Sequence, residues 1–185
     1  MDILIACEES GEVREAFAER GHNAWSCDIL PSRKPGNHIQ GTILSHEILK
    51  RHWDMLIAFP DCTFLASSGA RHMSTPWRKE AQMQALYFVR ALWAFPIERK
   101  ALENPIGRLS TLWMKPTQII QPWMFGHGET KATCLWLDNL PPLQPTNVVP
   151  ERENRVWKMA PSATRGRDRA KTFPGIAKAM AEQWG

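Results

Sequence analysis

The chain has 185 residues, 43% of them hydrophobic and 23% charged, which is the composition of one globular domain large enough to bury its own core. No apolar run approaches the length that spans a bilayer, and the N-terminal residues lack the basic flank of a signal peptide, so we expect a cytoplasmic protein whose chain opens with a strand. The four cysteines form no Cys-x-x-Cys pair and the six histidines show no ligand spacing, so we expect reduced thiols and no metal site.

The net charge of +4 comes from one segment of the chain. Residues 1–150 carry equal numbers of basic and acidic side chains, whereas residues 151–171 carry seven basic and three acidic ones. A basic segment on a neutral body is typical of contact with phosphate backbones, and a solvated surface loop is the alternative interpretation. We expect residues 165–169 to form a flexible loop suited to phosphate contacts rather than to base recognition.

The first elements follow the order of a nucleotide-binding half-site. Residues 2–7 predict a buried strand, the apolar positions after Gly11 predict a helix that ends at Gly21, and residues 23–27 predict a second strand. Asp28 follows this second strand, at the point where a carboxylate binds ribose hydroxyls. Because the first turn lacks Gly-x-Gly-x-x-Gly, a nucleoside cofactor is favoured over a dinucleotide.

Residues 31–42 have the composition of a loop, and residues 55–59 predict a strand buried on both faces. Pro60 cannot donate to a ladder and ends that strand, so Cys62 lies just past its carboxyl end. In an open α/β sheet, ligands bind at the carboxyl ends of the strands, which predicts that this thiol faces the active-site crevice. Two interpretations of Cys62 stay open, a nucleophile and a buried structural cysteine.

A long helix is predicted next, beginning at Thr75-Pro76 and ending before Pro96. We expect most of its aromatic residues, Tyr87 included, to belong to the core. A strand over residues 99–102 follows and leads to Glu103, a carboxylate that is either functional or a structural cap.

The remaining chain is rich in proline and tryptophan. It contains one more apolar strand over residues 134–137 and a last helix that starts at Phe173-Pro174. The alternation of strands and helices along the whole chain indicates an α/β fold.

The order of these motifs resembles a known family. Asp54, Pro60, Cys62 and Gly69 fall in register with the catalytic loop of DNA (cytosine-5) methyltransferases, which reads Gly-Gly-Pro-Pro-Cys-Gln-Pro-Phe-Ser-x-x-Gly after an Asp-led apolar strand. Residues 103–105 are similar to the family's Glu-Asn-Val motif, whose Glu holds the target cytosine at ring nitrogen 3 and at its amino group. The chain resembles a small, phage-type member, because only about twenty residues fill the interval in which the family carries a separate target-recognition domain.

The chain departs from the family's pattern beside the target base. Asp61 replaces the second proline of the catalytic loop, and because a neighbouring anion raises a thiol pKa, we expect it to point away from Cys62 or to pair with Lys131 or Arg71. Lys131 and Thr133 stand in place of the arginines of the family's Gln-x-Arg-x-Arg motif, the second of which touches the base carbonyl.

Departures also occur at the cofactor turn. Residues 7–11, Cys-Glu-Glu-Ser-Gly, replace the family's Phe-x-Gly-x-Gly-Gly, and the two glutamates either face the sulfonium or amino group of the cofactor or cap the following helix. Thr42 replaces the Asp of the family's Gly-Asp-Ile, which contacts the adenine amino group. Near the C-terminus, Arg152, Glu153 and Arg155 resemble the family's Arg-Glu-x-x-Arg signature.

The resemblance implies an α/β, Rossmann-like class I S-adenosylmethionine-dependent methyltransferase fold, with a mixed, mostly parallel sheet and helices on both faces. Residues 1–185 then form a single catalytic domain, in which the basic segment 151–171 takes the place of a recognition domain. The implied activity is transfer of a methyl group from S-adenosylmethionine to carbon 5 of cytosine in DNA. The implied location is the cytoplasm, or the host cytoplasm for a phage-encoded protein.

The residues implied for this activity fall into three groups. The catalytic residues are Cys62, which forms a covalent adduct with the base, and Glu103, which holds the base. The residues expected to bind S-adenosylmethionine are Ala6, Cys7, Glu8, Ser10, Gly11, Asp28, Ile29, Thr42 and Pro60. The residues expected to contact DNA or the target base are Ser67, Ser68, Arg71, Asn104, Lys131, Thr133, Arg152, Arg155, Arg165, Arg167 and Arg169.

Two other functions stay open. The same chemistry on a free pyrimidine nucleotide is favoured by the missing recognition domain and disfavoured by the basic segment. A catalytically inactive relative that binds DNA or the cofactor is favoured by the departures at Glu8, Thr42 and Thr133. Salt-dependent DNA binding would distinguish the DNA methyltransferase from an enzyme that acts on free nucleotides. Covalent trapping by a cytosine analogue would distinguish either of these enzymes from the inactive relative.

Overall fold

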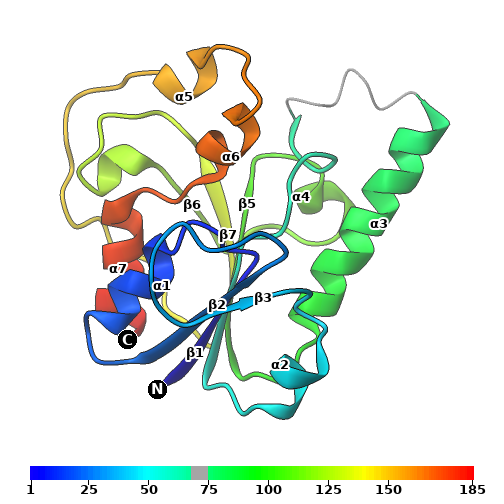
Figure 1. The fold of residues 1–185 in the computed structure, drawn as a ribbon. Coiled ribbons are helices and arrows are strands. Elements are labelled where there is room, and N and C mark those ends of the chain that lie inside the picture. Colours follow the sequence, from blue (N-terminus) through cyan, green and yellow to red (C-terminus); the bar gives the residue numbers. More distant parts are fainter. Residues whose placement is uncertain (68–74) are drawn as a thin grey trace.

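The computed structural model describes residues 1–67 and 75–185, and its centre is a seven-stranded sheet with the strand order β3-β2-β1-β4-β5-β7-β6 (Figure 1). The first five strands in this order are parallel to one another, whereas β7 is antiparallel to both of its neighbours. The sheet is therefore mixed and mostly parallel, as predicted. Its strands are β1 (Asp2–Ala6), β2 (Asn23–Asp28), β3 (His38–Gln40), β4 (Met55–Ala58), β5 (Arg99–Pro105), β6 (Gln118–Ile120) and β7 (Thr133–Asp138).

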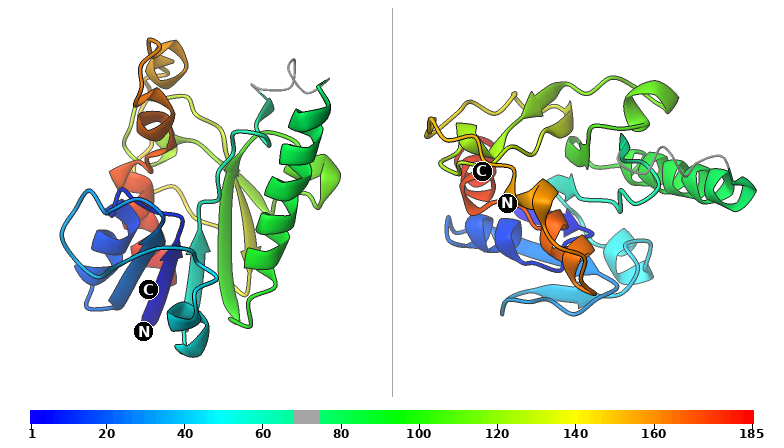
Figure 2. Two further views of the ribbon diagram at one scale, coloured as in Figure 1. Left: turned by 45° about the vertical axis from the view of Figure 1, so that its right-hand side comes forward. Right: turned by 90° about the horizontal axis from the view of Figure 1, so that it is seen from above.

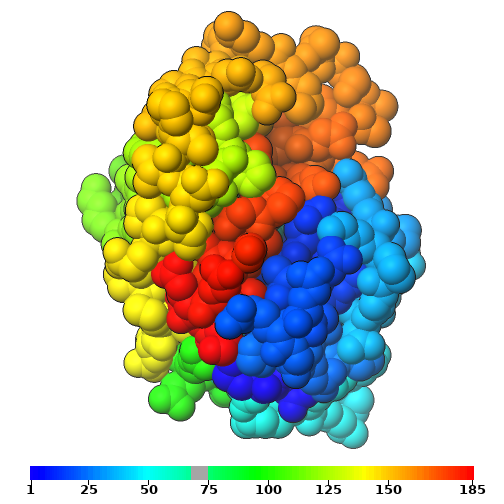
Figure 3. Space-filling model, turned by 90° about the vertical axis from the view of Figure 1, so that its left-hand side faces the viewer, coloured from blue at the N-terminus to red at the C-terminus, as the bar shows by residue number. Residues whose placement is uncertain are grey.

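Helices cover both faces of the sheet, which confirms that part of the predicted fold class (Figure 2). On one face, α1 and α7 pack side by side, and Figure 3 shows α7 in red lying along α1 in blue. On the other face, α3 covers β4 and β5. The helices are α1 (Glu12–Ala18), α2 (His46–Lys50), α3 (Pro76–Trp93), α4 (Leu109–Leu112), the 3-10 helix η2 (Pro122–Met124), α5 (Arg155–Lys158), α6 (Arg165–Ala170) and α7 (Pro174–Trp184).

The alternation of side chains along β1 explains why both faces carry a core. Ile3 and Ile5 point to one face and pack against α1 and α7, while Leu4 and Ala6 point to the opposite face. All four side chains are fully buried. A strand with two buried faces needs an unbroken apolar run, and that is the pattern from which the strand was predicted.

Most predicted elements are confirmed, and the exceptions are short. The helix predicted from Thr75-Pro76 is α3, whose first turn contains Pro76, and the last helix begins at Pro174. The interval 31–42, predicted as a loop, contains the three-residue strand β3, of which only Ile39 is buried. Such a strand has no periodicity to detect, and the same holds for β6.

Three predictions were wrong in detail. Glu103 lies within β5 and not beyond its end, because β5 stays paired with β7 as far as Pro105. Residues 165–170 form helix α6 instead of a flexible loop. Tyr87 is 55% exposed on α3 and does not belong to the core, because α3 buries its Leu86, Val89 and Leu92 side instead.

The strand order sets the place of the site. From β1 the chain crosses to β2 on one side, and β4 pairs with β1 on the other side, so β1 and β4 border a topological switch point. Open α/β sheets bind their ligands in the crevice outside the carboxyl ends of the strands at such a point. Among the described residues, no helix is long and apolar enough to cross a membrane.

Candidate active site

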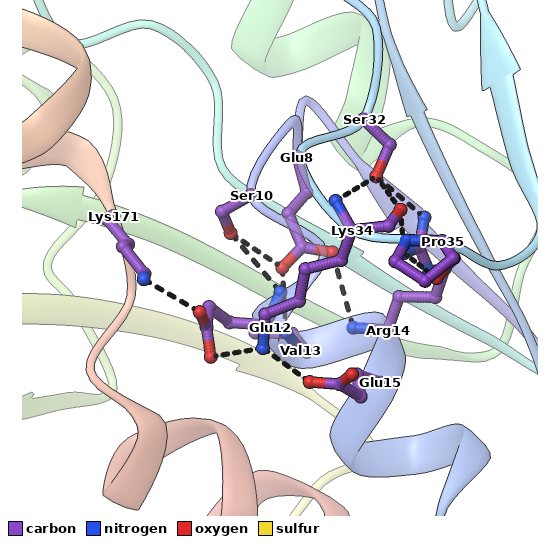
Figure 4. Close-up of polar contacts among 10 residues, drawn as sticks. All are labelled: Glu8, Ser10, Glu12, Val13, Arg14, Glu15, Ser32, Lys34, Pro35 and Lys171. Carbon is purple, nitrogen blue, oxygen red and sulfur yellow. Dashed lines mark hydrogen bonds and ion pairs between the residues drawn. The ribbon is translucent and has the colours of Figure 1, made fainter.

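The turn after β1 is held by the carboxylate of Glu8 (Figure 4). One Glu8 oxygen, Oε1, accepts hydrogen bonds from the Val13 backbone N–H at 2.7 Å and from the Ser10 hydroxyl at 3.2 Å. The other oxygen, Oε2, accepts from the Arg14 N–H at 3.2 Å. Burial raises the pKa of Glu8, and the two backbone hydrogen bonds oppose that rise. Glu8 was expected either to face the cofactor or to cap the following helix, and in this structure its carboxylate caps the N-terminus of α1.

The loop after β2 is fastened to the same turn by Arg14, which is fully buried. Its guanidinium donates to the hydroxyls of Ser26 and Ser32 at 2.9 and 3.0 Å. It also donates to the backbone oxygens of Lys34 and Pro35 at 2.9 and 2.8 Å. These side-chain bonds fix the loop after β2 against the start of α1.

Removing the Glu8 carboxylate tests its role as a cap. We expect Glu8→Ala to lower the free energy of unfolding by about 2 kcal/mol, because two helix N–H groups lose a buried acceptor. Urea denaturation measures this loss, and Glu8→Gln is the matched control, since it keeps one acceptor oxygen and should lose less. Equal stability of Glu8→Ala and the wild type would show that the cap contributes nothing.

The end of β2 presents a carboxylate next to an exposed apolar side chain. Asp28 is half-buried, and its Oδ1 accepts from the Leu30 N–H at 2.9 Å. Burial raises the pKa of Asp28, and the nearby charge of Glu9 raises it further. Ile29 is 74% exposed. A carboxylate beside an open apolar surface fits a ribose with its attached base.

Thr42, the residue predicted near the adenine amino group, lies on the surface. It is exposed, and its hydroxyl accepts from the Leu44 N–H at 3.3 Å. The other residues predicted to bind the cofactor lie at or just after the carboxyl ends of β1 and β4, or in the turn between β1 and α1. The structure brings them together at one edge of the sheet. They are Ala6, Cys7, Ser10, Gly11 and Pro60.

The Cys62 loop is anchored to β5 by a buried side chain. Asn104 is 1% exposed, and its amide nitrogen donates to the Pro60 carbonyl at 3.0 Å. Beyond Cys62, the N–H groups of Leu65 and Ala66 both donate to the Cys62 carbonyl at 2.9 Å. The loop is thus a tight turn, fixed from the neighbouring strand. In the described part of the chain, the side-chain amide oxygen of Asn104, Oδ1, is buried and has no hydrogen-bond partner.

The charged groups around Cys62 have opposite effects on the pKa of its thiol. Burial raises the pKa of its thiol to about 11, together with the negative charges of Glu103 and Asp61, while Lys131 lowers it. The Asp61 carboxylate accepts from the Thr63 N–H at 3.1 Å and from its hydroxyl at 2.7 Å. Asp61 Oδ1 is thus bonded within its own loop. Lys131 forms no ion pair with Asp61 within residues 1–67 and 75–185, and Arg71, the other predicted partner, lies outside the described residues.

Glu103 shares a small cavity with Lys131 and Thr133. Burial raises the pKa of the Glu103 carboxyl, and Lys131 lowers it in part. Within the described residues, no group donates a hydrogen bond to this carboxylate. The enclosed part of the cavity has room for about one water molecule, and Ala170, Thr172 and Phe173 also line it. The charges of Glu103 and Lys131 thus both act on the Cys62 thiol, and the charge of Lys131 also acts on Glu103.

Several cations of the basic segment form ion pairs with carboxylates elsewhere in the chain. Arg167 forms a two-pronged ion pair with Glu9, at 2.7 and 3.0 Å, and Lys171 pairs with Glu12 at 2.8 Å. Arg155 pairs with the buried Glu129. These cations are therefore held by carboxylates of the body, and Arg155 and Arg167 are not free for phosphate contacts in this structure.

The other predicted DNA contacts vary in accessibility. The Arg152 guanidinium lies 3.9 Å from the centre of the Trp123 ring. Ser67 is exposed, Arg169 is half-buried, and the buried Nε of Arg165 has no partner among the described residues. Ser68 and Arg71 lie outside the described residues.

Sequence reasoning missed the part that residues 170–173 play at the Glu103 cavity. No local signal marks it, because the ion pairs that fasten this segment join residues far apart in the chain, as in the 158 positions between Arg167 and Glu9.

The chain matches no protein-family model and no curated protein. Within the described residues, no group of three or more His, Cys, Asp or Glu side chains is arranged to hold a metal ion.

Proposed function

We propose that this protein is a class I S-adenosylmethionine-dependent methyltransferase that modifies carbon 5 of cytosine in DNA through a covalent Cys62 adduct. The observation that carries the proposal is the coupling of Cys62 with Glu103 across the adjacent parallel strands β4 and β5. A thiol just past one strand and a half-buried carboxylate on the next meet the requirements for nucleophilic attack on a base held at its polar edge.

Glu103 and Cys62 have complementary roles in this mechanism. Carbon 5 of cytosine is too weak a nucleophile by itself, and addition of the Cys62 thiolate to carbon 6 converts it into an enamine carbon. The raised pKa of Glu103 favours a carboxyl that shares its proton with ring nitrogen 3, which stabilises the charge that develops during the addition. A Glu103 neutralised in this way also stops opposing ionisation of Cys62, and Lys131 favours the thiolate. The adduct breaks down when a water molecule or a hydroxyl group takes the carbon 5 proton, the electron pair of that C–H bond restores the ring double bond, and the Cys62 thiolate is expelled.

The strand ends fit the cofactor of this reaction. Asp28 is suited to ribose hydroxyls, and exposed Ile29 offers an apolar surface for the adenine ring. When bound, S-adenosylmethionine supplies the activated methyl group for carbon 5. Glu8 would act indirectly, by fixing the turn through the start of α1.

The cavity at Glu103 implies a movement. Ala170, Thr172 and Phe173 line this small cavity together with Glu103, so we expect this segment to shift when a flipped-out cytosine enters. The cationic partners Arg167 and Lys171 are partly exposed, so they can turn from Glu9 and Glu12 towards phosphates when DNA binds. Glu12 keeps Lys34 as a second partner at 3.1 Å.

Transfer of labelled methyl groups from S-adenosylmethionine to duplex DNA tests the proposal, with deoxycytidine monophosphate as the competing substrate. We expect label in DNA, located at carbon 5 of cytosine after hydrolysis to nucleosides. Label in the mononucleotide alone would move the substrate class to free pyrimidine nucleotides. A folded protein that binds the cofactor and labels neither substrate would contradict the proposed activity.

A further inference from the structure

An aromatic and cationic cluster, in which Trp77 is exposed and Phe64 and Arg78 are half-buried, lies next to the Cys62 loop. The Phe64 ring, two positions after Cys62, meets the Trp77 ring edge to face, with ring centres 6.1 Å apart and an interplanar angle of 84°. The Arg78 guanidinium lies over both rings, 4.8 Å from the centre of Trp77 and 5.7 Å from that of Phe64. We call these three residues the aromatic cluster.

The aromatic cluster is joined to the Cys62 loop by a buried hydrogen bond. Gln82 of α3 is buried, and its side-chain amide donates to the Phe64 carbonyl at 2.9 Å. Figure 1 shows the N-terminal end of α3 at the same end of the sheet as this loop. The cluster therefore keeps a fixed position relative to the proposed nucleophile.

Core packing does not account for Trp77. Its side chain is 58% exposed, although tryptophan is one of the most costly residues to leave in water. Its observed aromatic and cationic neighbours are Phe64 and Arg78, which leaves much of the indole surface open.

The chemistry of the cluster fits a nucleotide. Nucleobases stack on exposed aromatic rings and on arginine planes, and this interaction tolerates any base because every base has a π face. The first turn of α3 carries Arg78 and Lys79 and no acidic residue, so an anionic phosphate is favoured beside the indole. An apolar protein surface would gain nothing from these two cations.

We infer that the aromatic cluster binds a nucleotide of the substrate strand next to the target cytosine. A base stacks on the open side of Trp77, and its phosphate pairs with Lys79 at the start of α3. This inference rests on the proposed function insofar as it takes DNA as the substrate, and it gives the protein a strand contact that needs no separate recognition domain.

The test is binding of a short, fluorescein-labelled single-stranded oligonucleotide, followed by fluorescence anisotropy without S-adenosylmethionine. We expect Trp77→Ala to weaken binding about tenfold at every salt concentration, equivalent to about 1.4 kcal/mol. Trp77→Phe keeps a ring face and should recover most of the affinity. Lys79→Gln should reduce the salt dependence of log Kd by about one counterion, because it removes a phosphate contact and leaves the stacking intact.

Tyr87→Ala is the matched control, because Tyr87 is a similarly exposed aromatic residue, ten positions further along the same helix. We expect it to bind like the wild type. Equal affinities of Trp77→Ala and the wild type would overturn the inference, and so would equal losses in Trp77→Ala and Tyr87→Ala. This assay measures oligonucleotide binding and involves no methyl transfer. A protein that lacks the proposed activity can therefore still show the loss of affinity in Trp77→Ala, and an active protein can fail to show it.

Discussion

Replacing Cys62 by alanine is expected to abolish methyl transfer to DNA, with turnover reduced roughly 10⁴-fold or more. In the proposed mechanism this thiol forms the bond to carbon 6 that makes carbon 5 of cytosine nucleophilic, and the methyl side chain of alanine cannot form it. The thiol is half-buried in a turn and contributes little to the core, so the variant should fold normally. Transfer of labelled methyl groups measures the loss, and circular dichroism checks the fold.

Cys134→Ala is the matched control for that experiment. Burial and Glu103 raise the pKa of the Cys134 thiol to about 11, as they do for Cys62, but Cys134 lies buried in the core beneath α3. We expect this variant to keep its activity and to lose some stability. Activity retained in Cys62→Ala, or abolished equally in both variants, would contradict the assignment of Cys62 as the nucleophile.

Glu103→Gln is expected to change transfer and thiol reactivity in opposite directions. Transfer should fall about 10²- to 10³-fold, because the amide cannot share a proton with ring nitrogen 3. The Cys62 thiol should become more reactive, because its pKa of about 11 is raised partly by the charge of Glu103. A lower pKa moves the thiolate to lower pH, so alkylation by iodoacetamide at a fixed pH below 11 should be faster than in the wild type.

The rate of Cys62 alkylation from pH 7 to 11, followed by peptide mass spectrometry, measures this shift. Lys131→Met provides the opposite control, because removing the cation raises the pKa of Cys62 and should slow alkylation at the same pH. A Glu103→Gln variant with the alkylation profile of the wild type would show that the two groups are not coupled.

The parts of the fold that the sequence predicts are those with a continuous local pattern. The apolar runs over residues 2–7 and 55–59 predict β1 and β4, and Pro76 predicts the start of α3. β3 and β6 escape prediction because each has three residues and takes its place by pairing with a neighbour. The residues of β7 do not indicate that the strand is antiparallel to β5, because its direction depends on the tertiary arrangement.

The candidate site shows the same division. Cys62 and Glu103 can be singled out because each lies at or near the carboxyl end of an apolar run. The effect of the Glu103 charge on the pKa of Cys62 instead depends on the pairing of β4 with β5, which no local pattern predicts. A count of charges in residues 151–171 predicts a basic segment but not its ion pairs. The partners of Arg167 and Lys171 are Glu9 and Glu12, which lie at the other end of the chain.

The measurement that tests the covalent mechanism most directly uses duplex DNA in which the target cytosine carries fluorine at carbon 5. Fluorine cannot leave as the proton does, so the adduct should persist. We predict a protein–DNA complex that resists denaturing electrophoresis, forms only with S-adenosylmethionine, and links the DNA to the peptide that contains Cys62. Wild-type protein that binds the DNA and the cofactor without forming this complex, or that forms it through another residue, would contradict the mechanism.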